Sequence, residues 1–182
     1  MAKVTVGPLV LKDDDGFMTG NLKLVHFATA LGAKKANALV EQETEYDDDE
    51  KPVIANEVRA GIEWLVKNER AAAKAVVSAI YAKHTDLGDK PSKRIKLQSV
   101  KFHDAVRANE PYIGFLFSCD WDDEHGLGVM MHGTRLVQIG GADTAILEWI
   151  ADRDARAGKS KKTATKKKAA SKKTAARKKT AR

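Results

Sequence analysis

The residues of this sequence that could do chemistry gather most densely between Cys119 and His132. The run Cys119-Asp-Trp-Asp-Asp-Glu-His125 brings a thiol, four carboxylates and an imidazole into seven consecutive positions. Cysteine, histidine and carboxylate side chains are the usual ligands of zinc and other transition metals. A thiol beside an imidazole could also form a nucleophilic pair, and two neighbouring carboxylates could catalyse hydrolysis. The run therefore raises a metal site, a cysteine nucleophile and a hydrolytic carboxylate pair as hypotheses.

The pattern of residues around this run argues against each of the three hypotheses. Structural zinc sites use four cysteine or histidine ligands at known spacings, and the sequence holds no such set. Cys119 falls on the apolar face of an alternating pattern, whereas a Cys119–His125 nucleophile pair needs an exposed thiolate and a third, orienting group. Asp122 and Glu124 have no second acidic constellation or sugar platform near them in the sequence. We therefore expect no metal, no cofactor and no catalytic residue.

The same run fits a turn that is held together by its own side chains. Aspartate and glutamate can accept backbone N–H bonds, His125 can pair with one acid, and Gly126 and Gly128 permit a tight backbone. Recognition of a protein partner through this loop is the chief alternative. The residues of this structural or partner-binding loop are Asp120, Trp121, Asp122, Asp123, Glu124 and His125. A metal-binding protein or a hydrolase that uses the Asp122–His125 loop stays open as a second function.

Alternating apolar residues predict the strands that position this loop. Ile113, Phe115, Phe117, Cys119 and Trp121 occupy every second position before it, and Leu127, Val129 and Met131 do so after it. His132-Gly133 then predicts a tight reversal into a strand at 136–139. We expect three antiparallel strands here, with Cys119, Phe117, Ile113, Val129 and Ile139 buried.

The first half of the chain predicts further strands and a long helix. Residues 3–11 and 17–27 are expected to be strands joined by a turn at 13–16, and residues 28–40 are expected to contain a short helix. Seven acids within residues 41–50 favour a flexible linker, or alternatively an acidic surface that mimics nucleic acid or docks the tail. Pro52 is expected to start a helix that ends at Lys83, with Val58, Ile62 and Ile80 on its apolar face.

The remaining elements complete the predicted fold. Residues 94–103 alternate as a strand, residues 104–111 read as a loop or one helical turn, and Asp143–Asp154 shows helical spacing. The sequence thus predicts one α+β domain at residues 1–157, with a mostly antiparallel sheet packed by one long helix and a shorter C-terminal helix. We expect both helices to cover the same face of that sheet.

Composition and the single cysteine predict a globular protein and its cellular compartment. Hydrophobic residues make up 43% of the chain, and no apolar run approaches the ~20 residues that span a bilayer. The N-terminus lacks the apolar core of a secretory signal, and Cys119 is the single cysteine, so no internal disulfide can form. We expect a cytoplasmic protein without a membrane partner.

The net charge of +7 conceals two oppositely charged parts. Residues 159–182 hold ten Lys, two Arg and no acid, so the preceding 158 residues keep 20 of the 32 basic residues against 25 acids, a formal charge of −5. With only Lys, Arg, Ala, Thr and Ser after Gly158, the tail at residues 158–182 cannot bury enough apolar surface to offset the entropy of ordering, so we expect it to be disordered. It also lacks aromatic side chains on which bases could stack.

We expect this tail to contact DNA or RNA through phosphates, without reading bases, and so to favour association with the nucleoid. A solubilising tail, or one folded back on the acidic body, is the alternative. The side chains expected to bind nucleic acid are Lys161, Lys162, Lys166, Lys167, Lys168, Lys172, Lys173, Arg177, Lys178, Lys179 and Arg182.

Two stretches carry a resemblance to known families. Phe-Leu-Phe-Ser-Cys-Asp-Trp-Asp-Asp-Glu-His-Gly-Leu-Gly-Val at 115–129, followed by Ile-Gly-Gly-Ala-Asp-Thr-Ala at 139–145, resembles an uncharacterised bacterial domain family with a C-x-W-D-x-E-H-G-L-G-V signature. This resemblance implies an α+β fold, a relation to the immunity proteins found beside polymorphic toxins, and no catalytic residue. The tail resembles those of linker histones and histone-like bacterial proteins, which implies sequence-independent binding to phosphate backbones. Together these features predict a non-enzymatic binding module for an unknown protein partner.

Overall fold

The structure is a computed structural model that describes residues 3–14, 16–49, 51–88 and 91–157. The tail predicted to be disordered therefore lies outside the described residues. The elements are β1 (Lys3–Val6), β2 (Leu9–Asp14), β3 (Phe17–Lys23), α1 (Val25–Leu31), β4 (Asn37–Glu43), β5 (Glu45–Tyr46), β6 (Pro52–Val53), α2 (Asn56–Lys83), a 3₁₀ turn (Pro91–Lys93), β7 (Ile95–Arg107), β8 (Glu110–Cys119), β9 (Leu127–His132), β10 (Arg135–Gly140) and α3 (Asp143–Ile146), followed by helical residues 148–157.

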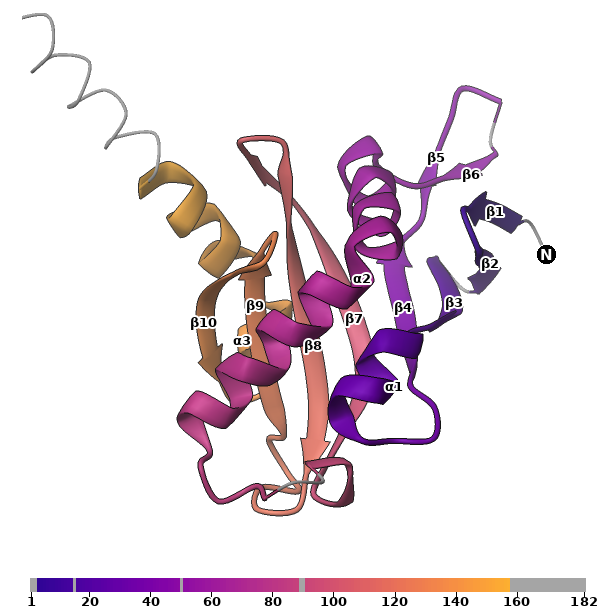
Figure 1. Cartoon of the computed structure of the whole chain (residues 1–182). Helices are drawn as coiled ribbons and strands as arrows, with labels where there is room; N and C mark the ends of the chain where they lie inside the picture. The colour runs from indigo at the N-terminus through magenta and orange to yellow at the C-terminus, as the bar shows by residue number, and fades with distance from the viewer. Residues whose placement is uncertain (1–2, 15, 50, 89–90, 158–182) are drawn as a thin grey trace, which may run out of the picture.

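Most of the described chain is organised on one sheet with the strand order β1-β2-β3-β4-β7-β8-β9-β10. Neighbouring strands run antiparallel except β4 and β7, which pair in parallel at Leu39 with Ser99 and at Val40 with Val100. A parallel pair needs a crossover connection, and α2 supplies it by crossing one face of the sheet (Figure 1). The prediction of a mostly antiparallel sheet with one long helix is confirmed.

Apolar side chains fill both sides of this sheet. On one face, α1 and α2 cover the main core, which includes Phe27, Ile62, Phe115 and Phe117. On the other face, residues 143–157 cover a smaller cluster around Tyr112, Met130, Ile150, Ala151 and Ala155. Figure 1 shows α3 behind the sheet and α2 in front of it.

The prediction that both helices share one face is therefore wrong, because β8 is apolar on its two sides. Ile113 and Phe115 face α2, whereas Tyr112 faces residues 148–157. Gly114 lies between them, and a Cβ atom there would come within 1.7 Å of the Ala145 carbonyl oxygen. Only glycine allows the C-terminal segment to approach the strand this closely.

The three central strands and the apolar face of the long helix agree with the sequence. Cys119, Phe117, Ile113 and Val129 are buried, as predicted, and so are Val58, Ile62 and Ile80 on α2. Ile139 is an exception, because it lies half-buried at the margin of the main core. Gly133 adopts φ 55° in the reversal between β9 and β10. No helix among the described residues is long and apolar enough to cross a membrane.

The first half of the chain needs several corrections. The predicted strand at 3–11 is two strands, because Gly7 adopts φ 55° and the chain reverses between β1 and β2. The predicted strand at 17–27 ends at Lys23, and α1 begins at Val25. The short helix predicted within 28–40 is therefore the end of α1, while β4 already begins at Asn37. Residues 104–111 also differ, since β7 continues to Arg107 and turns into β8 through Ala108 and Asn109, both with positive φ.

The flexible linker predicted for the acidic stretch at 41–50 is wrong for its first three residues, because these belong to β4. Val40 and Gln42 point inward while Glu41 and Glu43 point to solvent, so β4 is half-buried here. Residues 45–46 form β5, and residues 47–49 are exposed in the connection to β6. Pro52 does not start the long helix either, because β6 pairs Pro52 with Tyr46 of β5 and α2 begins at Asn56.

Candidate functional site

The densely ionisable turn predicted from the sequence connects β8 to β9, and we call residues 120–126 the signature turn. The Asp122 carboxylate accepts hydrogen bonds from the backbone N–H of His125 and from its ring nitrogen Nδ1, each at 3.0 Å. The Asp122 carbonyl accepts the Gly126 N–H at 2.9 Å, and Gly126 takes the φ of 60° that closes the turn. The bonds from the His125 backbone and ring lower the pKa of Asp122. The expectation that Asp122 bonds backbone and His125 is confirmed.

Cys119 takes part in the same turn as a buried structural group. Its thiol donates a hydrogen bond to the Asp122 carbonyl at 3.6 Å. Burial raises the pKa of this thiol, so Cys119 is protonated at neutral pH. The sulfur therefore points into the turn, while the His125 side chain is exposed on the surface.

Asp120 and Trp121 bind the start of the turn to the strand beside it. The Arg94 side chain forms an ion pair with Asp120 at 3.0 Å and another with Asp86 at 2.7 Å. The same guanidinium lies over the Trp121 ring, 5.3 Å from its centroid, and the His84 ring approaches Trp121 from the end of α2. Arg94 thus joins the end of α2, the start of β7 and the signature turn.

Asp123 and Glu124 differ from the other candidates because both side chains are exposed. The expected hydrogen bond from Glu124 to backbone or His125 does not appear among the described residues. In the described part of the chain, no three histidine, cysteine, aspartate or glutamate side chains gather where they could hold a metal ion. The predicted nucleic-acid-binding side chains, from Lys161 to Arg182, lie outside the described residues.

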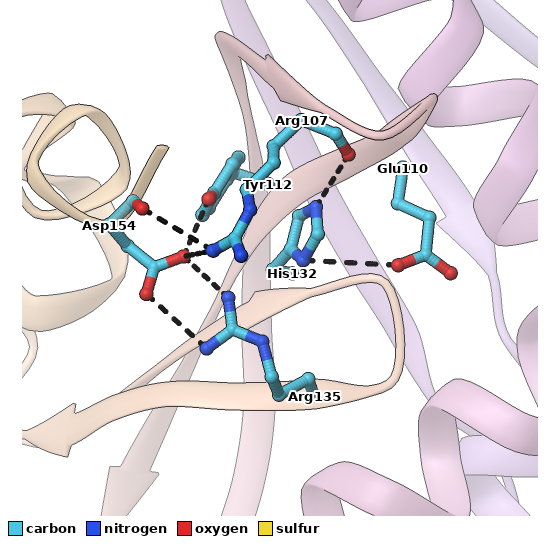
Figure 2. Close-up of polar contacts among 6 residues, drawn as sticks. All are labelled: Arg107, Glu110, Tyr112, His132, Arg135 and Asp154. Atoms are coloured by element: carbon cyan, nitrogen blue, oxygen red, sulfur yellow. Dashed lines mark hydrogen bonds and ion pairs between the residues drawn. The ribbon is translucent and has the colours of Figure 1, made fainter. Parts of the chain in front are cut away.

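A second polar cluster, which the sequence did not predict, surrounds Asp154 (Figure 2). The Tyr112 hydroxyl donates a hydrogen bond to the Asp154 carboxylate at 2.6 Å, and the Arg107 and Arg135 guanidinium groups pair with the same carboxylate. Burial opposes ionisation of Asp154, but the bonds from Arg135 and Tyr112 prevail and lower its pKa. Burial, followed by the bond to Asp154, raises the pKa of Tyr112 to about 12.

The cluster continues around His132 at the turn between β9 and β10. The His132 ring nitrogen Nε2 donates to the Arg107 carbonyl at 2.8 Å, and its Nδ1 lies 3.8 Å from the Glu110 carboxylate. The ring also packs against Tyr112, with 4.6 Å between centroids (Figure 2). Asp154 lies on the helical residues 148–157, so its contacts with Tyr112, Arg107 and Arg135 fix that helix on the sheet.

The sequence contains one signal that could have revealed this cluster. Asp154 falls on the face of its helix that also holds Ile150, Ala151 and Ala155, which pack inward. A carboxylate on an apolar face needs partners, because a buried charge without them is costly. Its partners come from three other strands, so helical spacing alone could not name them.

The outer side of the same segment carries exposed apolar side chains. Trp149 is 52% exposed, and Ile146 and Leu147 beside it are exposed as well. The Arg153 guanidinium lies over the Trp149 ring at 4.8 Å and bonds Gln138 of β10. We call Ile146, Leu147 and Trp149 the apolar patch. Tryptophan and arginine are enriched among residues that dominate protein–protein binding.

The fold and these sites define a small α+β domain with a long crossover helix and an anchored C-terminal segment. The family described as Domain of unknown function (DUF6985) matches residues 18–147, which is more than half of the chain. The chain therefore belongs to this family. Comparison with the curated proteins and with the solved structures gives no match. The family match includes the signature turn and the β4–α2–β7 crossover, and it ends within the apolar patch.

Proposed function

We propose that this protein is a non-enzymatic binding module, whose folded body recognises a protein partner and whose basic tail contacts DNA or RNA without sequence specificity. The observation that carries the proposal is the apolar patch. Its three apolar side chains are exposed within one short segment, and the helical residues that follow are fixed to the sheet by the Asp154 cluster. A rigid surface of this kind loses little entropy when a partner covers it.

The charge distribution supports the second half of the proposal. The tail carries twelve cationic side chains without one acid, whereas the preceding residues carry a formal charge of −5. Lysines spread along a chain without aromatic residues release counterions from phosphates but cannot read base edges. The acidic residues 41–49 can compete for the tail within the same molecule and so weaken this binding.

The signature residues 119–129 support a narrower placement of the protein. They resemble a bacterial domain family related to immunity proteins, which act by binding a partner protein rather than by chemistry. A cytoplasmic location, with association to the nucleoid through the tail, agrees with the single cysteine and the tail charge.

Partner recognition is tested by tagging the full chain and quantifying retained proteins from its source cells. Trp149→Ala should reduce retention of a stoichiometric partner by about tenfold or more, because an interfacial tryptophan commonly contributes at least about 2 kcal/mol. Val25→Ala, which truncates an exposed apolar side chain on α1, serves as the matched control and should retain the partner. Equal retention by the Trp149→Ala variant would contradict this part of the proposal.

Nucleic-acid contact is tested by a salt titration on two unrelated DNA duplexes. We expect equal affinity for both duplexes, with a slope of log K against log salt near about −0.9 for each phosphate that is neutralised. Removal of residues 158–182 should abolish binding, and neutralisation of the acids at 41–49 should strengthen it. Equal affinity with and without the tail would contradict this part of the proposal.

A further inference from the structure

A cleft opens where the two parallel strands of the sheet diverge. β4 and β7 pair at Val40 and Val100, but no pairing between them follows among the described residues. The gap contains a cavity of about 310 Å³, which we call the β4–β7 cleft. It lies beside the carboxyl end of β4 and the start of α2, the place where open sheets with parallel strands commonly bind ligands.

The cleft contains a buried polar group that lacks a partner. Gln42 is only 4% exposed and lines the cavity, yet its amide nitrogen Nε2 has no hydrogen-bond partner within the part of the chain that the structure describes. The side chain follows Val40 on the inward face of β4, beneath the first turn of α2. A buried donor without an acceptor is costly, so this amide marks a place where a ligand acceptor would be stabilising.

The start of α2 adds further donors beside Gln42. The residue before the helix, Ala55, lines the cleft and provides no side-chain cap, and Val58 of the first turn also lines it. Backbone N–H groups in the first turn of a helix have no acceptor within the helix. The inner wall of the cleft therefore favours a carbonyl or carboxylate oxygen.

The rim of the cleft has the opposite preference. Glu43, Glu45, Asp104 and Glu148 surround the opening, against Lys101 as the one lysine or arginine among the lining residues. All four acids are exposed, so they attract a cation without a large cost of desolvation. A ligand that fits the cleft thus carries an acceptor at its inner end and a positive charge at its rim.

We propose that the β4–β7 cleft binds an extended peptide segment of the partner that carries an arginine or lysine side chain. The peptide carbonyl accepts from Gln42 and the first turn of α2, while the basic side chain meets the carboxylates of the rim. On the side of β4, the edge of β7 from Lys101 onward pairs with no strand of the described residues, so an extended peptide also finds backbone partners there. This proposal rests on the proposed partner recognition and names the chemistry of one partner segment.

The cleft and the apolar patch can serve one interface, because Ile146 belongs to both. A partner that covers Trp149 would therefore reach the rim of the cleft at Glu148. The cleft supplies charge selectivity, whereas the patch supplies apolar contact area.

The test measures the binding of fluorescent pentapeptides to the full chain by anisotropy. The peptides have the sequences Ala-Ala-Arg-Ala-Ala and Ala-Ala-Glu-Ala-Ala, and free arginine amide serves as a competitor. We expect the arginine peptide to bind at least about tenfold more tightly than the glutamate peptide, in a salt-dependent manner. Equal affinity of the two peptides would overturn the proposal. Competition by free arginine amide as strong as that by the unlabelled arginine peptide would overturn it in favour of a small-molecule site.

Three variants locate the site on the protein. Gln42→Met keeps the side-chain volume and removes the amide, so it should raise the thermal midpoint of the ligand-free protein and weaken peptide binding about fivefold. The double variant Glu43→Gln and Glu148→Gln should reduce both the affinity and its dependence on salt. Glu124→Gln, which alters an exposed acid outside the cleft, is the matched control. An unchanged affinity in the double variant, or an equal loss in the control, would overturn the proposal even if Gln42→Met failed to fold.

A carbodiimide reagent distinguishes the partner peptide from the protein's own tail, because it joins lysines to carboxylates that already form ion pairs. Coupling of tail lysines to Glu43 or Glu148, together with failure of the arginine peptide to bind, would overturn the proposal in favour of the tail. The capture experiment with Trp149→Ala uses no peptide. If a partner is retained through Trp149 but the arginine peptide does not bind, the peptide site alone is wrong.

Discussion

The signature turn and the β4–β7 cleft place similar side chains in opposite situations. In the turn, the Asp122 carboxylate, the Cys119 thiol and the Asp120 carboxylate all have partners within the protein. In the cleft, the Gln42 amide nitrogen is buried with no partner among the described residues, and four carboxylates face solvent. A dense run of ionisable residues therefore forms a structural turn, whereas a single glutamine marks the cleft where we propose that the partner peptide binds.

This contrast separates substitutions that should alter folding from substitutions that should alter ligand binding. Changes of Cys119, Asp120 or Asp122 should act on folding, because their contacts are internal to the protein. Changes of Gln42 or of the rim carboxylates should act on ligand binding and leave folding intact or improved. The predictions below follow this separation, from the largest expected effect to the smallest.

The largest of these effects is expected at Gly128, the second residue of β9. A Cβ atom there would lie 2.5 Å from the Gly141 carbonyl oxygen and 2.8 Å from the Ala145 nitrogen. Both are backbone atoms, so Gly128→Ala must displace α3 and should lower the free energy of unfolding by about 3 kcal/mol. Chemical denaturation of the two proteins measures the difference. A change below about 0.5 kcal/mol would contradict the close packing of α3 on β9.

A smaller effect, which depends on pH, is expected at His103 in the cleft. This side chain is 3% exposed, its Nε2 donates to the Ala145 carbonyl at 3.0 Å, and burial lowers its pKa, with Lys101 acting in the same direction. As pH falls below about 6.5, the unfolded chain therefore takes up a proton before the folded protein does, and stability declines.

His103→Gln keeps a donor for the Ala145 carbonyl and removes the titrating ring. We expect this variant to lose less stability than the wild-type protein between neutral pH and about pH 5. Thermal unfolding at several pH values measures the difference. Below about pH 4, the carboxylates of Asp122 and Asp154, whose pKa values are lowered in the folded state, should destabilise both proteins alike. Parallel curves above that pH would contradict the role given to His103.

The smallest effect is expected at Glu124, which, like Asp123, is exposed and makes no side-chain hydrogen bond or ion pair among the described residues. Glu124→Gln should leave the denaturation midpoint unchanged, because it alters only an exposed side chain. A loss of stability in this variant would show that the turn depends on its total charge rather than on the bonds of Asp122.

The sequence predicted those parts of the fold that depend on local periodicity. Alternation between Ile113 and Cys119 and helical spacing along α2 both led to the observed elements. The buried face of β4 also alternates, but its exposed glutamates led us to predict a linker for residues that form a strand. Periodicity records the burial of side chains, whereas charge on the outer face of a strand says nothing about its structure.

The candidate sites depended on contacts that periodicity does not encode. The bonds of Asp122 join residues three positions apart, so the turn could be anticipated from its residue types. The Asp154 cluster joins a helix to strands, and the β4–β7 cleft exists only because two parallel strands diverge. Neither arrangement follows from the order of residues along the chain, because both arise from the pairing of distant elements.

A comparison of Asp122→Ala with Gln42→Met tests most directly whether the signature turn supports the structure and the cleft binds the partner. Asp122→Ala removes a carboxylate that accepts the His125 N–H, so its denaturation midpoint should fall while the folded variant still binds the arginine peptide. Gln42→Met should show the opposite, with an equal or higher midpoint and weaker peptide binding. An Asp122→Ala variant that is fully stable but no longer binds would contradict this division and place recognition in the signature turn.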